Sequence, residues 1–372
     1  MSSIDHGLHA VTRRQALKGA TGILGLAGAL GVSGCSSSST DGQSSGSSDG
    51  GDEKSYKVAM IMSETLTDRG WGQGHYESLQ RAVESHPNWT MLQPRENTAS
   101  ADAANAAQRY VDQDVDLIIG AGNEFASDWK DVIESAADGN PNVHFLLTNT
   151  NPMDELADYT TLANVETVLP NFIQIGALAG VIAGLMTNNN SIGFIAGMKL
   201  PSSTAKYAAY LAAAQKVNPQ VTGMYNFDAG FTDSAFGANL TNQWIASNNV
   251  DVMWGDASGV DNGARQALEQ AGAETHFDIA QPIDIVGDSE PTVIASTVLD
   301  WMIAQALDEV EAGTFGNGEV ITASMDNGGV SLGKFSDKVP ADVQEKIEEY
   351  EDQISAGTFL TDDEVSAIEQ TL

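Results

Sequence analysis

Basic residues and cysteine are scarce in this sequence. Its 372 residues contain 17 Lys and Arg against 51 Asp and Glu, a formal net charge of −34, and they include a single Cys. A protein this acidic is repelled by nucleic-acid phosphates and by anionic lipid surfaces, so we expect no nucleic-acid partner. One cysteine excludes an intrachain disulfide and any metal site built from several cysteines.

The acidic residues admit two interpretations. They could bind cations, or they could form a hydrated surface that stays soluble where salt screens charge, since the Debye length is only about 3 Å at 1 M salt. The carboxylates are spread along the chain and form no Asp-x-Asp/Asn-x-Asp/Asn-Gly ligand loop. This distribution favours the second interpretation, a halophilic protein adapted to high salt.

Motifs for phosphate binding and catalysis are also missing. The chain has no Gly-x-x-x-x-Gly-Lys-Ser/Thr motif, and beyond residue 34 its histidines stand singly. Ser203 and Lys206 match the Ser-x-x-Lys pattern of penicillin-interacting serine enzymes, but the Lys-Thr-Gly partner of that pattern is absent. We therefore expect no enzyme, no cofactor and no bound metal, and any ATPase partner must be a separate chain.

The first 35 residues have the features of an export signal. Arg13 and Arg14 precede an apolar run from Gly19 to Val32, which is shorter than the roughly 20 residues that span a bilayer. The paired arginines resemble a twin-arginine signal, and Cys35 resembles the lipidated cysteine of a lipobox. We predict a signal peptide over 1–34 and a lipid anchor at Cys35, which would hold the protein on the outer face of the cytoplasmic membrane.

The segment after Cys35 differs from the rest of the chain in composition. Residues 36–55 consist mainly of Ser, Gly and Asp and offer almost nothing to a core. We predict a flexible tether over 35–55, with the folded body beginning at Tyr56.

The body alternates short apolar runs with helical patterns, which favours parallel sheets covered on both faces. Predicted strands cover 57–62, 89–93, 116–120, 143–148, 191–196, 221–227, 250–254 and 282–286. Predicted helices cover 75–85, 101–113, 126–137, 172–186, 204–217, 234–247, 263–270 and 292–311. Two successive series of this kind predict an α/β protein with two doubly wound lobes. Ligands of such sheets bind outside the carboxyl ends of the strands, so we expect a site between the lobes.

Loops after the predicted strands carry glycines together with polar or aromatic side chains. The candidate ligand-binding residues in these loops are Asp68, Trp71, Gln73, Asn123, Glu124, Gly259, Asn262 and Asp288. Glycines let the backbone approach a ligand closely, and an indole offers a flat stacking face. Alternatives stay open for single residues, because Trp71 could be a core aromatic, and Asp68 and Asp288 could cap helices or lie on the surface.

The body resembles the basic membrane protein (BMP) family of ABC-transporter substrate-binding lipoproteins, whose better-known members bind purine nucleosides. The resemblance runs from about Lys57 to Gly333. It rests on the segments Asp68–Gln73, Ile192–Pro201, Asn262–Gly263, Val286–Ser289 and Gly328–Leu332.

The resemblance implies a type I periplasmic-binding fold whose two lobes close on the ligand. It places one lobe at 56–168 plus about 292–322, and the other at 169–291 plus about 323–372. Trp71 would replace the aromatic residue that stacks on the base, with Asp68 as its acidic neighbour. Asp288 would match the Asp that grips ribose hydroxyls, and the loop from Gly259 would pass close to the ligand.

The sequence departs from the family pattern at two positions. Leu299 stands where the family usually has a lysine, in a segment that the resemblance places at the start of the last long helix. Lys206 stands where the family usually has an aromatic residue. These departures leave the ligand open and do not affect the transporter interpretation.

Together, these features predict a monomeric substrate-binding lipoprotein of an ABC importer. It would capture a small polar ligand, with nucleosides as the leading class, and deliver it to a membrane permease. Three alternatives remain: a sensor subunit for a membrane signalling protein, a receptor for a sugar or another heterocycle, and a secreted hydrolase.

Overall fold

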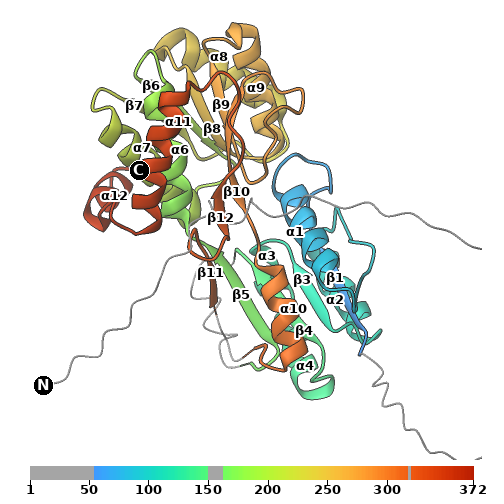
Figure 1. Ribbon diagram of the computed structural model, residues 1–372. Coiled ribbons are helices and arrows are strands. Elements are labelled where there is room, and N and C mark those ends of the chain that lie inside the picture. Colours follow the sequence, from blue (N-terminus) through green and yellow to red (C-terminus); the bar gives the residue numbers. More distant parts are fainter. Residues whose placement is uncertain (1–53, 150–161, 317–319) are drawn as a thin grey trace, which may run out of the picture. The chain divides into compact units, whose positions relative to one another are not determined.

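The computed structural model describes residues 54–149, 162–316 and 320–372 (Figure 1). The predicted signal peptide, the Cys35 anchor and the tether up to residue 53 lie outside the described residues. Residues 53–372 form one compact unit. Within the described ranges, no helix is both long enough and apolar enough to cross a membrane.

The first sheet is entirely parallel and has the order β11-β5-β4-β3-β1-β2. Its strands are β1 (Tyr56–Ile61), β2 (Trp89–Met91), β3 (Leu117–Gly120), β4 (His144–Thr148), β5 (Val165–Pro170) and β11 (Val320–Ala323). Its helices are α1 (Trp71–Ser85), α2 (Ser100–Val111), α3 (Glu124–Asp128), α4 (Lys130–Gly139) and α10 (Ile303–Ala312).

Alternate residues of these strands enter two different cores. Val58 and Met60 of β1 belong to the same hydrophobic cluster as residues of α1 and α10. Ala59 and Ile61 belong to a second cluster with residues of α2, α3 and α4. The period of two along the strand therefore places helices on both faces of the sheet, as predicted for a doubly wound lobe.

The second sheet has the order β12-β10-β9-β8-β6-β7 and is parallel except for β12, which runs antiparallel to β10. Its strands are β6 (Ser191–Ala196), β7 (Thr222–Asn226), β8 (Val252–Asp256), β9 (Phe277–Ala280), β10 (Val293–Leu299) and β12 (Val330–Leu332). Its helices are α6 (Phe172–Met186), α7 (Pro201–Val217), α8 (Ser234–Asn248), α9 (Gly259–Gly272), α11 (Ala341–Ser355) and α12 (Asp362–Glu369).

Close packing of α6 against α7 depends on glycine. A Cβ at Gly176, Gly180 or Gly184 would lie 2.4, 2.2 or 2.7 Å from a backbone oxygen of α7. The glycines recur every four residues, so they share one helix face and let the two backbones approach. This contact fixes α7, which carries Lys206 toward the site described below.

Two predictions near the end of the second sheet were wrong. The segment predicted as a helix over 292–311 is strand β10 followed by the shorter helix α10, because Val293, Ile294 and Thr297 favour a strand. The segment predicted as a strand over 282–286 is irregular, and the true strand is β9. Asp278 interrupts the apolar pattern of β9, which concealed that strand in the sequence.

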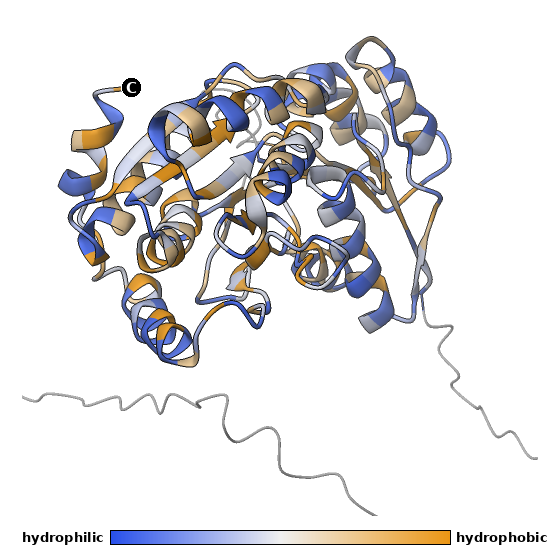
Figure 2. Cartoon of the chain, turned by 90° about the horizontal axis from the view of Figure 1, so that it is seen from above, coloured by the Kyte–Doolittle hydropathy of each residue, from blue (hydrophilic) through white to orange (hydrophobic). Residues whose placement is uncertain are grey.

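The chain passes from one sheet to the other after β10. Strand β10 belongs to the second sheet, and the helix that follows it, α10, contacts α1 beside the first sheet. Strands β5 and β11 belong to the first sheet and end at Pro170 and Ala323. Several helices show mixed blue and orange residues along their length, as amphipathic elements do (Figure 2).

Candidate functional site

A cavity of about 720 Å³ lies at the carboxyl ends of strands from both sheets. Segments that follow β1, β3 and β4 line one side, and segments that follow β6, β8 and β9 line the other. This is where parallel α/β sheets bind ligands, because crossover loops of variable sequence meet there. We call it the main cavity, and we call its two sides the first-sheet wall and the second-sheet wall.

Trp71 is the aromatic residue of the first-sheet wall. It begins α1, and its indole Nε1 donates a hydrogen bond to the carbonyl of Ala121 at 3.2 Å. The indole contacts the ring of Trp301 with centroids 4.6 Å apart and the ring of His75 at 4.9 Å. Packing and a hydrogen bond therefore fix the orientation of this side chain before any ligand binds.

His75 forms a neutral support behind Trp71. Burial lowers the pKa of His75 to about 3, and its ring stacks on Trp301 at 3.9 Å. Its Nδ1 lies 2.8 Å from the carbonyl of Trp71, which can only accept, so Nδ1 carries the proton. The hydroxyl of Thr148 then donates to Nε2 at 2.8 Å.

Two glutamates also lie in the first-sheet wall. Ser63 donates to Glu124 at 2.7 Å, and the neighbouring Glu64 has a carboxyl oxygen without a hydrogen-bond partner. Burial and the negative charge of Glu124 raise the pKa of Glu64 to about 7. This wall therefore offers acceptors beside its aromatic surface.

The second-sheet wall is centred on Asp256, the last residue of β8. The ammonium group of Lys206 lies 2.7 Å from Asp256 Oδ1, and the hydroxyl of Ser203 lies 3.4 Å from Oδ2. The side-chain amide of Gln281 donates to the carbonyl of Gly255 at 2.5 Å and lies 3.4 Å from Asp256 Oδ1. Lys206 is buried, so the ion pair holds Asp256 in a fixed position in this wall.

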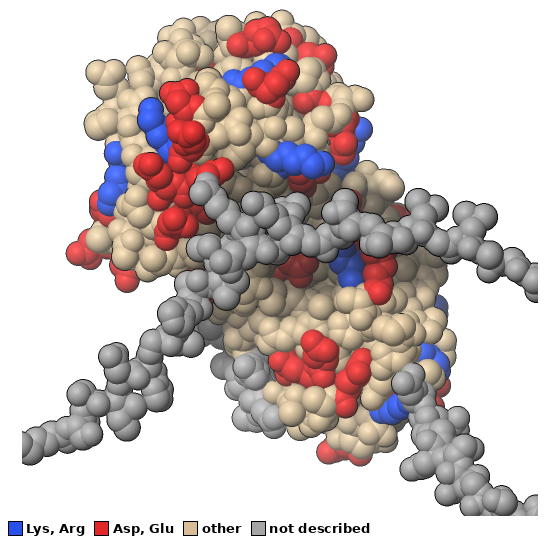
Figure 3. Space-filling model, viewed as in Figure 1, with Lys and Arg blue, Asp and Glu red and all other residues tan. Residues whose placement is uncertain are grey.

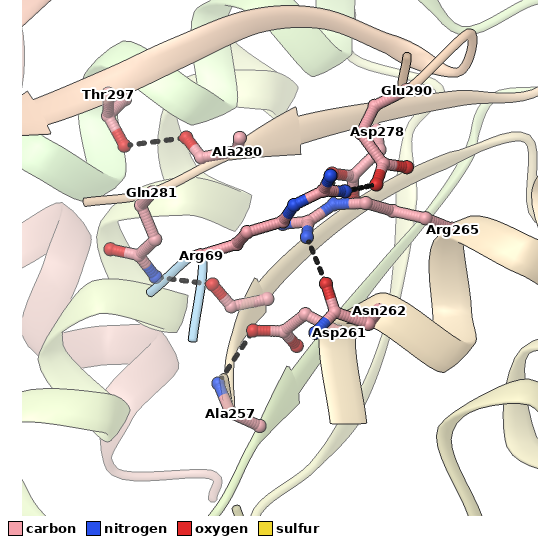
Figure 4. Close-up of polar contacts among 11 residues, drawn as sticks. Arg69, Ala257, Asp261, Asn262, Arg265, Asp278, Ala280, Gln281, Glu290 and Thr297 are labelled. Carbon is pink, nitrogen blue, oxygen red and sulfur yellow. Dashed lines mark hydrogen bonds and ion pairs between the residues drawn. The ribbon is translucent and has the colours of Figure 1, made fainter. Parts of the chain in front are cut away.

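Asp261 lies in the first turn of α9 and completes this wall. Its Oδ2 accepts from the backbone nitrogen of Ala257 at 2.8 Å (Figure 4). Burial raises the pKa of Asp261 to about 7, although the positive charge of Arg265 opposes the shift. Arg265 is itself held by Asp278 at 2.8 Å and by Asn262 at 3.0 Å.

The predicted site residues fall into three groups. Trp71, Asn123 and Glu124 line the main cavity. Asp68, Gly259 and Asn262 line a second cavity of about 630 Å³, which shares Ser63, Glu64, Asn97, Phe231 and Ser258 with the first. Gln73 and Asp288 line neither cavity.

Three of these residues have local roles that the contacts explain. Asp68 accepts from the backbone nitrogens of Gly70, Gly72 and Gln73, so it caps the start of α1. The side chain of Gln73 accepts from the nitrogen of Arg69 at 3.2 Å. Asp288 is exposed, in a turn where its nitrogen donates to Ile285.

The main cavity also contains residues that were not among the predicted set. They are Glu64, Phe231, Asp256, Asp261, Gln281 and Lys206, the last noted in the sequence only as a departure from the family. Asp256 follows the predicted strand over 250–254 by two residues, so the expectation that ligands bind outside the carboxyl ends of strands could have found it. Gln281 directly follows β9. The predicted strand began five residues later, at residue 282, so Gln281 was not recognised as a residue at a strand end. Leu299, the other departure, is buried at the end of β10 and does not line the cavity.

An ion pair joins the two lobes beside the second cavity. Arg69 precedes α1 in the first lobe, and its guanidinium contacts the carboxylate of Glu290 in the second lobe (Figure 4).

Among the described residues, no group of three or more His, Cys, Asp or Glu side chains could hold a metal ion.

Comparison with known proteins places this architecture in a family. A model of PnrA-like ABC-transporter substrate-binding proteins, the Bmp family, matches residues 55–363. The nucleoside-binding protein BmpA of an ABC transporter from Lactococcus lactis is 25% identical over 74% of this chain and 81% of its own. The Haloferax volcanii protein TsgA13, named for glucose binding in an ABC transporter, is 23% identical over 80% of this chain and 71% of its own.

A solved structure shows the same fold. An ABC-transporter solute-binding protein from Conexibacter woesei superposes with a TM-score of 0.68 at 21% identity, covering 83% of this chain and 99% of that one. The predicted two-lobed α/β fold of the type I periplasmic-binding class is thus confirmed. The family consists of substrate-binding proteins of ABC transporters. The chain belongs to the PnrA-like, or Bmp, family of ABC-transporter substrate-binding proteins.

Proposed function

We propose that this receptor captures a small polar ligand with a flat ring, a nucleoside in the first place, in the main cavity. It then delivers the ligand to a membrane permease that is powered by a separate ATPase. The observation that carries the proposal is the pairing of a fixed indole in one wall with hydrogen-bond acceptors in the other.

The aromatic residues suit a flat ligand. Trp71 stands in the first-sheet wall, and Phe231, which is 42% exposed, contributes a ring from the second lobe. Stacking of a base on an aromatic side chain contributes about 1–3 kcal/mol. Asp256, Asp261 and Gln281 supply acceptors suited to the hydroxyl groups of a sugar.

The relatives favour two ligand classes. BmpA of Lactococcus lactis is named for nucleoside binding, and TsgA13 of Haloferax volcanii for glucose binding. A nucleoside uses both the aromatic and the acceptor features of the cavity, whereas a sugar uses mainly the acceptors. The sugar is therefore our second candidate.

Transport requires the lobes to close on the ligand and the closed form to be recognised by the permease. We also propose that the chain returns to the first lobe near residue 300, that the protein is a monomer, and that it is exported and held at the membrane by a lipid anchor at Cys35.

In Figure 3, red Asp and Glu outnumber blue Lys and Arg on the face shown. This supports the proposal that the receptor works in high salt, where such charge is screened.

Calorimetry in molar salt tests the proposal with adenosine, guanosine, inosine, uridine, ribose and glucose. We expect a nucleoside to bind with a dissociation constant in the micromolar range or below. Trp71→Ala should weaken binding about tenfold to a hundredfold, the value of one stacking contact. Phe236→Ala is the matched control, since Phe236 is an exposed aromatic residue outside both cavities. Absence of binding by the whole panel would contradict the proposal.

A further inference from the structure

The second cavity continues the main cavity and is lined by both lobes. Its volume is about 630 Å³, and the residues that it shares with the main cavity come from both sheets. Ser63, Glu64 and Asn97 follow β1 and β2, whereas Phe231 and Ser258 follow β7 and β8. A ligand in the main cavity therefore has a further polar space directly beside it.

The charged side chains of the second cavity are already engaged within the protein. Asp68 accepts from three backbone nitrogens at the start of α1, and Arg69 is paired with Glu290. Burial and the negative charge of Glu124 raise the pKa of Glu64 to about 7, so Glu64 carries only part of a charge at neutral pH. The described lining of this cavity therefore offers no unpaired cation to an anionic ligand.

The uncharged polar side chains of the second cavity are free and accessible. The side chains of Thr65, Thr67, Asn97, Thr232 and Ser258 make no hydrogen bond to another described residue. Each of them is partly or fully exposed, so a ligand can reach it. Hydroxyl and amide groups both donate and accept hydrogen bonds, which suits them to the hydroxyl groups of a ligand.

Ser258 stands at the boundary between the two cavities. It precedes α9 at the position where a serine hydroxyl usually caps the helix, but its backbone has φ 46° and its side chain makes no capping bond. Such a backbone costs free energy in a residue other than glycine, and it is found most often at ligand sites. Gly70 of the other lobe leaves room for this hydroxyl, since a Cβ there would lie 2.9 Å from Ser258 Oγ.

We propose that the second cavity is a subsite for a second, uncharged and hydroxylated unit, joined covalently to the unit that the main cavity holds. The ligand is then a glycoside of two units, either a disaccharide or a nucleoside that carries an additional sugar. This inference rests on the proposed function and extends its ligand from one unit to two. A phosphate in the second cavity is disfavoured, because Asp68 and Glu290 are negative and Arg69 is already paired.

Matched ligands of one and two units test the inference on the unmodified protein. Calorimetry in molar salt compares glucose with maltose and cellobiose, and adenosine with 2′-O-ribosyladenosine and 5′-O-glucosyladenosine. We expect at least one two-unit ligand to bind about tenfold tighter than its one-unit counterpart, the effect of one or two added neutral hydrogen bonds. A gain in the glucose series assigns a disaccharide, and a gain in the adenosine series assigns a glycosylated nucleoside.

The outcomes separate the two proposals. If one-unit ligands bind and every two-unit ligand binds equally or more weakly, the inference is overturned and the receptor function stands. A panel without any binder would overturn both. Adenosine 5′-monophosphate should gain nothing over adenosine, and a gain as large as that of the sugars would show that the second unit is not required to be uncharged.

Gln266→Trp tests where the second unit lies. Gly259, Asn262 and Gln266 share the face of α9 that lines the second cavity, and Gln266 is exposed. An indole at this position should fill the cavity and reduce the ratio of two-unit to one-unit affinity to about one. Gln270→Trp is the matched control, because Gln270 is exposed one turn further along α9, outside both cavities, and should keep the full ratio. An unchanged ratio in Gln266→Trp would show that the second unit lies elsewhere.

Discussion

The two walls of the main cavity rest on different supports. Behind Trp71 of the first-sheet wall lies a neutral aromatic layer, in which His75 stacks on Trp301 at 3.9 Å. Behind Asp261 of the second-sheet wall lies a buried ion pair, with Arg265 and Asp278 2.8 Å apart. Both supports are almost fully buried, so solvent screens neither of them.

This contrast shows two physical ways to hold a side chain for binding. The aromatic layer gains stability from apolar burial and works only while His75 stays neutral. The ion pair must overcome the cost of removing two charges from water, so it depends on both partners being present. The two supports should therefore fail under different perturbations.

Arg265→Met should give the largest effect, because it leaves Asp278 buried without its partner. We expect a loss of about 3–5 kcal/mol in the free energy of unfolding, measured with denaturant in molar salt. Lys216→Met is the matched control, since Lys216 and Glu364 form an exposed pair at 3.0 Å worth about 1 kcal/mol or less. Equal losses for the two variants would contradict the distinction between the supports.

His75→Phe tests the aromatic support through its dependence on pH. The folded pKa of about 3 lies below the ordinary value of 6.5, so the unfolded chain takes up a proton first as the pH falls. His75 should therefore remove about 2 kcal/mol of stability between pH 7.5 and pH 5. His75→Phe removes both hydrogen bonds of the imidazole ring at every pH. Its free energy of unfolding should nevertheless lack the decrease that His75 causes between pH 7.5 and pH 5. Identical slopes for the variant and the unmodified protein would show that His75 is not the responsible group.

Arg69→Met should have the smallest effect, because the Arg69 side chain is 44% exposed and its partner Glu290 is only partly buried. We expect a loss of about 1 kcal/mol or less at low salt and almost none in molar salt. Arg109→Met, which removes the same charge from the surface of α2, is the control. A loss as large as that of Arg265→Met would show that this pair belongs with the buried supports.

Much of the first-sheet wall could be predicted from the sequence, and less of the second. Trp71, Asn123 and Glu124 stand at the end of loops that follow apolar strands, where ligands of parallel sheets are expected to bind. Gln281 was hidden, because a charged residue, Asp278, lies inside strand β9 and breaks the apolar pattern. Asp278 is tolerated there only because Arg265, thirteen residues earlier, packs against it.

The sequence by itself determined the alternating α/β architecture, the family and the strand ends where a ligand would lie. These properties follow from local periodicity and from short motifs, which a single chain displays directly. Only the tertiary structure decided which polar atoms are buried, paired or left without a donor. Asp68 and Asp261 are both acids beside glycine-rich loops, yet Asp68 caps a helix, whereas Asp261 lines the main cavity and keeps one buried oxygen without a hydrogen-bond partner. That difference depends on neighbours far apart in the chain, which no local pattern encodes.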